Sequence, residues 1–190
     1  MCEPIIEVTR ETAGEYFARL DPLVAQGTVL YIYGGAAIAL LGSGIRTTMD
    51  VDVAEPYSHF DRLAFAAASE RAGLPINPKV DYEAAFLELV GEFRLCVPRP
   101  TDDKPGIELF KGINLTVRTG SAADLIASKL IRYDEQDQQD IQFLLKAGKT
   151  TISAIKESVS RLPDAFCNDV LVKENLDNLE RDMNVWGGGS

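Results

Sequence analysis

Two carboxylates separated by a single residue, Asp50 and Asp52, stand inside an apolar run. If this run is a strand, side chains at positions i and i+2 project from the same face. Neighbouring carboxylates repel each other unless a cation lies between them or one of them is protonated. Mg²⁺ prefers oxygen ligands and commonly binds one or two carboxylates together with substrate phosphates. The pair therefore predicts half of a magnesium site, although an isolated pair of this kind is more often the acidic face of an exposed strand.

A glycine pair, Gly34 and Gly35, comes before the carboxylates. It follows an apolar run at residues 29–33 that predicts a strand, and small residues at 36–41 predict a short helix. Glycine lets the backbone adopt positive φ and approach a ligand closely, and the first N–H groups of a helix can bind an anion. Alone, the pair indicates only a tight turn. Followed by a second strand at residues 45–54, which carries the two carboxylates, it predicts a phosphate site beside a metal site.

The chain carries three short motifs in order, which are Gly34-Gly35-Ala36-Ala37, Arg46-Thr47 and Asp50-Val51-Asp52. Together they resemble the GG…RxTxDxD signature of the nucleotidyltransferase (polymerase β-like) superfamily. Within the superfamily the chain is most similar to the small bacterial group that includes the AbiEii and MenT toxins and the DUF6036 proteins. A downstream stretch is similar to the DLxxxKxxR…DxxD(I/L) segment of that group, and it consists of Asp124-Leu125-Ile126-Ala127-Ser128-Lys129 followed by Asp137-Gln138-Gln139-Asp140-Ile141. The resemblance spans about residues 28–148.

The resemblance implies a nucleotidyltransferase fold and a Mg²⁺-dependent enzyme. Such an enzyme transfers a nucleoside monophosphate from an NTP to an acceptor by in-line displacement. The implied acceptor is an RNA end or a protein, and the implied setting is a toxin–antitoxin pair or a phage-defence system with a partner antitoxin or toxin.

The resemblance also implies roles for the matched residues. Asp50 and Asp52 match the metal ligands, and Gly34 and Gly35 match the phosphate loop. The other matched positions are Lys129, which would contact the triphosphate, Asp140, which would lie near the pocket, and Arg46 with Thr47, which would orient the carboxylates or reach phosphate. Without the upstream motifs, Lys129 and Asp140 would indicate only solvated residues of a helix surface.

One feature of the superfamily has no obvious match. Many members carry a third carboxylate on a later strand, where it serves as a base on the acceptor hydroxyl. In residues 113–117 the corresponding position falls on Asn114 or Thr116, and neither side chain is an ionised base at neutral pH. Glu108 and Asp81 are alternatives without a spacing argument. The alternative function is therefore a catalytically silent nucleotidyltransferase-like antitoxin or binding protein.

Hydrophobic periodicity and breaker residues predict the elements that must position these groups. We expect an α/β (α+β) fold with a small mixed sheet covered by helices and a C-terminal helical region. The expected strands lie at residues 29–33, 45–54, 93–97, 107–110 and 113–117, with the last two forming a hairpin around Lys111-Gly112, and residues 81–90 fit either a helix or a strand. The expected helices lie at residues 9–26, 36–41, 58–72, 136–147, 152–162 and 163–185, with one more beginning at Ser121.

Cap residues mark several of these ends. Thr9 and Thr12 both fit as the cap of the first helix, Ser58 fits as the cap of the third, and Asp124 suits the first turn of the helix that begins at Ser121. We expect a nucleotidyltransferase-like domain at residues 1–120, a helical region at 121–186 and a flexible tail at 187–190.

Composition excludes several other classes of protein. The net charge of −10 disfavours wrapping a nucleic acid over a large surface. The single histidine, His59, excludes histidine-rich metal sites and Ser-His-Asp catalysis. Cys2, Cys96 and Cys167 are far apart and indicate free thiols. No apolar run approaches the roughly 20 residues needed to cross a bilayer, and residues 1–10 lack the pattern of a signal peptide, so we expect a cytoplasmic protein without a membrane partner.

Overall fold

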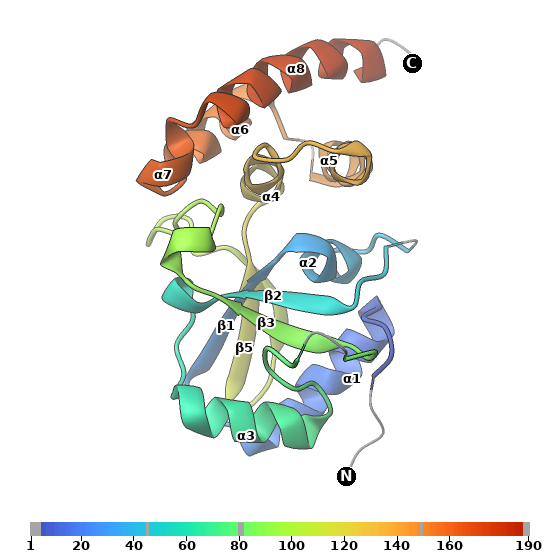
Figure 1. The fold of residues 1–190 in the computed structure, drawn as a ribbon, viewed down its shortest axis with the longest axis vertical. Helices are drawn as coiled ribbons and strands as arrows, with labels where there is room; N and C mark the ends of the chain where they lie inside the picture. The colour runs from blue at the N-terminus through green and yellow to red at the C-terminus, as the bar shows by residue number, and fades with distance from the viewer. Residues whose placement is uncertain (1–4, 45, 80–81, 149, 188–190) are drawn as a thin grey trace. The chain divides into compact units, whose positions relative to one another are not determined.

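A five-stranded mixed sheet organises the N-terminal part of the computed structural model, which describes residues 5–44, 46–79, 82–148 and 150–187. Helices make up most of the C-terminal part, so the predicted α+β fold class is confirmed (Figure 1). The chain divides into two compact units. The first contains Met1–Arg94 and Gly106–Thr119, and the second contains Leu95–Pro105 and Gly120–Ser190.

The strands of the first unit are ordered β3-β2-β1-β5-β4 across the sheet. Their bounds are β1 Thr28–Tyr33, β2 Asp50–Ala54, β3 Phe86–Val90, β4 Ile107–Lys111 and β5 Leu115–Thr119. β1 pairs parallel with β5 and antiparallel with β2, and β2 pairs parallel with β3. β4 and β5 form the predicted antiparallel hairpin. Most residues of the central strand β1 are buried, as its β-branched and aromatic sequence predicts.

Three helices accompany this sheet, namely α1 (Arg10–Leu20), α2 (Gly34–Leu40) and α3 (Arg62–Ala72). α1 and α3 lie side by side, and the hydroxyl groups of Tyr16 and Ser69 form a buried hydrogen bond of 2.7 Å between them (Figure 1). α2 follows β1 directly and contacts both β1 and β2. The strand-and-helix order predicted around the glycine pair is therefore confirmed.

The observed ends of α1 and α3 refine the predicted ends of these helices. Thr9 caps α1 and forms a capping box with Thr12, which decides between the two predicted starts. α1 ends at Leu20 rather than near residue 26, because Asp21–Leu23 forms a 3₁₀ turn with a proline at its start. α3 begins after its cap Asp61, later than predicted, because the Ser58 hydroxyl donates to the carbonyl of Ala54.

Two predicted strands are corrected. The strand predicted at residues 45–54 begins only at Asp50, and Ile45 lies outside the described residues. The strand predicted at residues 93–97 is wrong, because Glu92–Arg94 forms a 3₁₀ turn, η3, and the chain then enters the second unit. Residues 81–90, which fitted a helix or a strand, contain β3, while Asp81 lies outside the described residues.

Asp21 ties the β4–β5 hairpin to the end of α1. Its carboxylate accepts backbone N–H bonds from Ile113 (3.0 Å), Asn114 (2.8 Å) and Leu115 (2.8 Å). The side-chain amide of Asn114 donates to the Asp21 carbonyl at 3.0 Å. Burial opposes ionisation of the carboxyl, but the three N–H donors prevail and lower the pKa of Asp21. The hairpin turn is therefore anchored by a charged residue far away in the sequence.

The second unit is helical. Its helices are α4 Ala122–Lys129, α5 Glu135–Gly148, α6 Ile152–Ser160, α7 Asp164–Cys167 and α8 Val170–Gly187. Ser121 and Asp124 form a capping box at the start of α4, which confirms the predicted start. α4 contacts α5 and α6. The single helix predicted at residues 163–185 is wrong, since it divides into α7 and α8, and residues 188–190 of the predicted tail lie outside the described residues.

The two described cysteines are free thiols, as predicted, and Cys2 lies outside the described residues. Cys96 is buried, and burial together with the charge of Asp169 raises the pKa of its thiol to about 12. A pKa raised in this way favours the protonated thiol at neutral pH, whereas the thiolate is the nucleophilic form.

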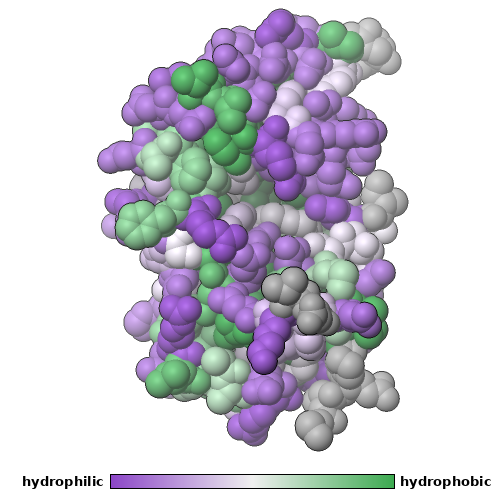
Figure 2. Space-filling view, in the orientation of Figure 1, coloured by the Kyte–Doolittle hydropathy of each residue, from purple (hydrophilic) through white to green (hydrophobic). Residues whose placement is uncertain are grey.

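Hydrophilic side chains cover most of the face drawn in Figure 2, and hydrophobic ones appear in small separate groups. None of the helices in the described part of the chain combines the length and apolar character that a bilayer crossing requires.

Candidate functional site

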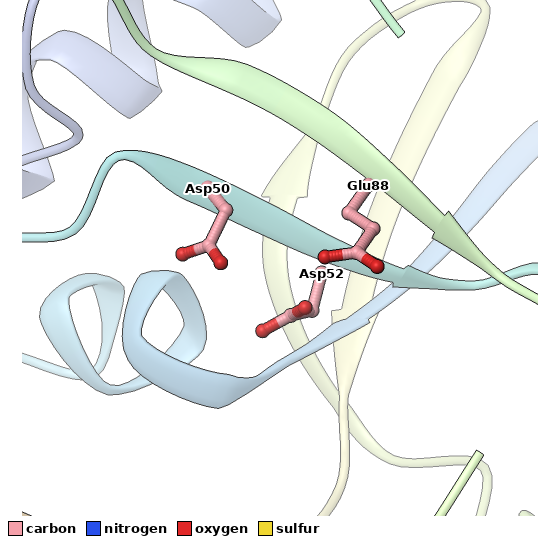
Figure 3. Close-up of side chains that lie close together, drawn as sticks. All are labelled: Asp50, Asp52 and Glu88. Carbon is pink, nitrogen blue, oxygen red and sulfur yellow. The ribbon is translucent and has the colours of Figure 1, made fainter. Parts of the chain in front are cut away.

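Three half-buried carboxylates meet on one face of the sheet in the first unit. They belong to Asp50, Asp52 and Glu88, and each offers an oxygen within 4.8 Å of the others. Figure 3 shows Asp50 and Asp52 projecting from β2 to the same side, with Glu88 of β3 reaching toward Asp52. Among the described residues, this is the one group of three or more acidic, histidine or cysteine side chains close enough to share an ion. We call these three residues the acidic triad.

Strand register places Glu88 in the acidic triad. β2 and β3 are parallel, and Asp52 lies directly opposite Glu88. Paired residues on adjacent strands share a face and lie about 5 Å apart. A shift of one residue would turn Glu88 to the other face. The sequence motifs do not mark Glu88, because the superfamily pattern places the third carboxylate at residues 113–117, although the polar position inside Phe86–Val90 is a usable signal.

Gly34 makes room for the carboxylate of Asp52. It has φ of +68°, the left-handed region that glycine tolerates best, and a Cβ at this position would lie 2.2 Å from Asp52 Oδ2. In Figure 3 the chain that joins β1 to α2 runs next to Asp52. A side chain at Gly34 would therefore have to displace a member of the acidic triad. The predicted phosphate contact of the glycine pair stays a prediction.

Arg46 and Thr48 lie over Gly35. A Cβ at Gly35 would be 3.0 Å from Arg46 Nη2 and 3.1 Å from the Cβ of Thr48. The Thr48 hydroxyl donates a hydrogen bond to Asp50 Oδ1 and so orients that carboxylate. Thr47, which was predicted to act here, is exposed. The threonine that binds Asp50 is therefore Thr48, which the sequence motif did not single out.

The donor set of the acidic triad suits a hard divalent cation. All three side chains supply carboxylate oxygens, the ligands that Mg²⁺ and Mn²⁺ prefer. Three ionised carboxylates at this spacing repel each other unless positive charge compensates them. Arg94 supplies some of this charge, since its Nη2 lies 2.8 Å from Glu88 Oε1. The three carboxylates therefore suit a bound cation by the type of their ligand atoms. Gly34, which has no side chain, leaves the space that the Asp52 carboxylate occupies among them.

Lys129 and Asp140, the other predicted site residues, belong to the second unit and contact each other. Lys129 Nζ lies 2.8 Å from Asp140 Oδ2 and 3.0 Å from Asp137 Oδ1. All three side chains are less than 10% exposed. Arg132 also donates to both carboxylate oxygens of Asp137. Burial of Asp137 opposes its ionisation, but the bond from Arg132 and the charge of Lys129 prevail and lower the pKa of this carboxyl.

This buried ionic cluster joins the end of α4 to α5 within the second unit. Removing one member of a buried ion pair leaves the other charge uncompensated. The cluster therefore gives Lys129 and Asp140 a structural role. Their predicted roles toward a triphosphate and its pocket stay predictions.

A hollow of about 230 Å³ lies between α5 and α8. It is lined by Gln142, Leu145, Lys146, Thr150, Met183 and Trp186. None of these six lining residues carries a carboxylate, so together they offer no ligand set for a divalent cation.

No family model, curated protein or solved structure matches the chain.

Proposed function

We propose that this protein is a Mg²⁺-dependent nucleotidyltransferase that transfers a nucleoside monophosphate from an NTP to an RNA end or a protein acceptor. The observation that carries the proposal is the acidic triad, in which Asp50, Asp52 and Glu88 lie within 4.8 Å of one another beside Gly34. The order of motifs along the sequence supports the same assignment. The resemblance to bacterial toxins also favours a cytoplasmic toxin–antitoxin or phage-defence role with a partner antitoxin or toxin.

Asp50, Asp52 and Glu88 are the residues that would hold the metal. A bound Mg²⁺ would supply positive charge to the phosphate oxygens of the NTP and to the developing charge on the leaving group. Thr48 keeps the Asp50 carboxylate oriented through its hydroxyl bond. Gly34 allows Asp52 to lie against the start of α2, where any other side chain would intrude.

The proposed reaction balances without another reactant. The acceptor hydroxyl oxygen bonds to the α-phosphorus of the NTP, and the bond from this phosphorus to the oxygen bridging to the β-phosphorus breaks. Pyrophosphate leaves with the electron pair of that bond. We assign the proton of the acceptor hydroxyl to the carboxylate oxygen of Glu88 that does not hold the cation, because each triad residue needs to offer only one of its two oxygens as a ligand.

The catalytically silent alternative rested on the absence of a carboxylate at residues 113–117. Asn114 has a structural task there, since its amide donates to the Asp21 carbonyl at 3.0 Å. Glu88 offers a third carboxylate from a different strand, which favours the enzyme over the silent protein.

A label-transfer assay tests the proposal. The full chain is incubated with each of the four labelled NTPs, Mg²⁺, and either total RNA or its own purified protein. We expect transfer by the wild type that falls to background in Asp52→Asn and Glu88→Gln. Asp61→Asn is the matched control, because Asp61 caps α3 through a 2.8 Å bond from the Ala64 N–H and asparagine caps equally well. Absence of transfer with all four nucleotides and both acceptors would support the silent alternative.

A further inference from the structure

We propose that Arg94 is a phosphate-binding residue of the same site, which Glu88 holds by an ion pair until a divalent cation takes over that carboxylate. This inference rests on the proposed function, because it requires the acidic triad to bind a cation. It adds to the site a residue that binds the substrate and that no sequence motif singled out.

The Arg94 side chain lies against β3, the strand that carries Glu88. After β3 ends at Val90, the backbone N–H of Arg94 donates to the carbonyl of Gly91 at 3.1 Å and closes the turn η3. The guanidinium then reaches back, so that Nη2 lies 2.8 Å from Glu88 Oε1. The Arg94 side chain is 73% exposed, whereas that of Glu88 is 27% exposed. The guanidinium therefore contacts the triad carboxylate while most of the Arg94 side chain stays in solvent.

Electrostatics favours an exchange of partners at Glu88. A solvent-exposed ion pair contributes little free energy, because water screens it and holding the side chains costs entropy. A divalent cation bound by three carboxylates interacts more strongly with Glu88 than one exposed guanidinium does. Cation binding therefore releases Arg94 at low cost.

The released guanidinium is chemically matched to the next ligand. Its planar fork of N–H donors fits phosphate oxygens and forms paired, charge-assisted hydrogen bonds. Arg94 is tethered within six residues of Glu88, so it remains near the metal ligands after the exchange. A triphosphate that shares the cation with the acidic triad would bring its oxygens into this neighbourhood. Arg94 thus serves two partners in sequence, first Glu88 and then the NTP.

The first unit contains a matched control pair. Arg62 Nη1 lies 3.0 Å from Glu55 Oε1, and the two side chains are 63% and 29% exposed, close to the values for Arg94 and Glu88. Glu55 is not part of the acidic triad. Arg62→Gln therefore removes the same charge and the same kind of ion pair without touching the proposed site.

Isothermal titration of the full chain tests the exchange in two steps, with Mn²⁺ alone and then with a non-hydrolysable NTP analogue in saturating Mn²⁺. We expect Arg94→Gln to bind Mn²⁺ about twofold to fivefold more tightly than the wild type, because the competing ion pair is gone. We expect the same variant to bind the NTP analogue at least about tenfold more weakly, because charge-assisted bonds to phosphate are lost. Arg62→Gln should change neither affinity.

Tighter binding of Mn²⁺ together with weaker binding of the NTP analogue distinguishes this role of Arg94 from a purely structural one. If Arg94→Gln leaves both affinities unchanged, or weakens both, the proposed exchange of partners at Glu88 is wrong. The proposed metal site at the acidic triad is then unaffected. If the wild type and Arg62→Gln bind no Mn²⁺, the proposed function fails and the exchange fails with it.

Discussion

Replacing Gly34 by alanine tests the link between the glycine pair and the acidic triad. A Cβ at Gly34 would lie 2.2 Å from Asp52 Oδ2, 3.3 Å from its Cγ and 3.7 Å from its Cβ. Gly27 provides the control, since it also has positive φ, +83°, but has no atom within 4 Å of an added Cβ. Both variants place alanine in the left-handed region, and only Gly34→Ala collides with a carboxylate.

The backbone strain lowers the free energy of unfolding, whereas the displacement of the Asp52 carboxylate lowers metal binding and the reaction rate. Left-handed backbone costs an L-residue about 1–2 kcal/mol, so both variants should lose this much free energy of unfolding. The carboxylate of Asp52 must retreat by at least 0.8 Å to reach the 3.0 Å limit of normal contacts. A carboxylate at the end of a short side chain can rotate away, so the fold survives and the ligand geometry changes. Displacement by about 1 Å from the reacting groups costs on the order of 100-fold in rate.

The assays are urea unfolding, Mn²⁺ titration and NTP label transfer on both variants. Gly34→Ala should match Gly27→Ala in stability, bind Mn²⁺ more weakly and transfer label at roughly one hundredth of the wild-type rate. Gly27→Ala should retain wild-type Mn²⁺ affinity and transfer. Equal Mn²⁺ affinity in the two variants would refute the reasoning. It would mean that Mn²⁺ binding does not depend on the position of the Asp52 carboxylate beside Gly34.

Three further predictions test the triad, the hairpin anchor and the buried ionic cluster. Mn²⁺ at 100 times its Kd should raise the wild-type free energy of unfolding by about 2.7 kcal/mol, and Glu88→Gln should greatly reduce this rise in thermal unfolding; an unchanged rise would remove Glu88 from the ligands. Asp21→Ala should cost about 1–3 kcal/mol at neutral pH in urea unfolding, because three N–H bonds lose their acceptor. The pKa of Asp21 is lowered from 3.8, so this difference should be full above that pH and fade as pH falls through the lowered pKa; a pH-independent difference would contradict the anchor. Lys129→Met should cost about 3–5 kcal/mol, because two buried carboxylates, Asp137 and Asp140, lose their ion pairs with Lys129, whereas Lys156→Met at an exposed pair should cost less than about 1 kcal/mol; similar costs would contradict the cluster.

Local patterns predicted much of the fold for physical reasons that act over a few residues. The β-branched run before Gly34 predicted β1, and Ser121 with Asp124 predicted the start of α4. Such signals depend on backbone sterics and on hydrogen bonds between near neighbours. The predicted strand at residues 93–97 failed because alternation alone does not reveal a pairing partner. Leu95 and Val97 are buried, but they belong to the second unit.

Sequence alone determined that Asp50 and Asp52 share a face, because alternation along a strand is a local property. It also marked Gly34 as a residue with a special backbone or contact. Only the tertiary structure decided that Glu88 joins the carboxylate pair, since the register between β2 and β3 arises from packing of segments distant in the chain. Likewise, only folding brought Lys129 to Asp137 and Asp140 in a buried cluster. The physical reason is that burial and partner choice depend on how elements pack, which spacing within one element does not specify.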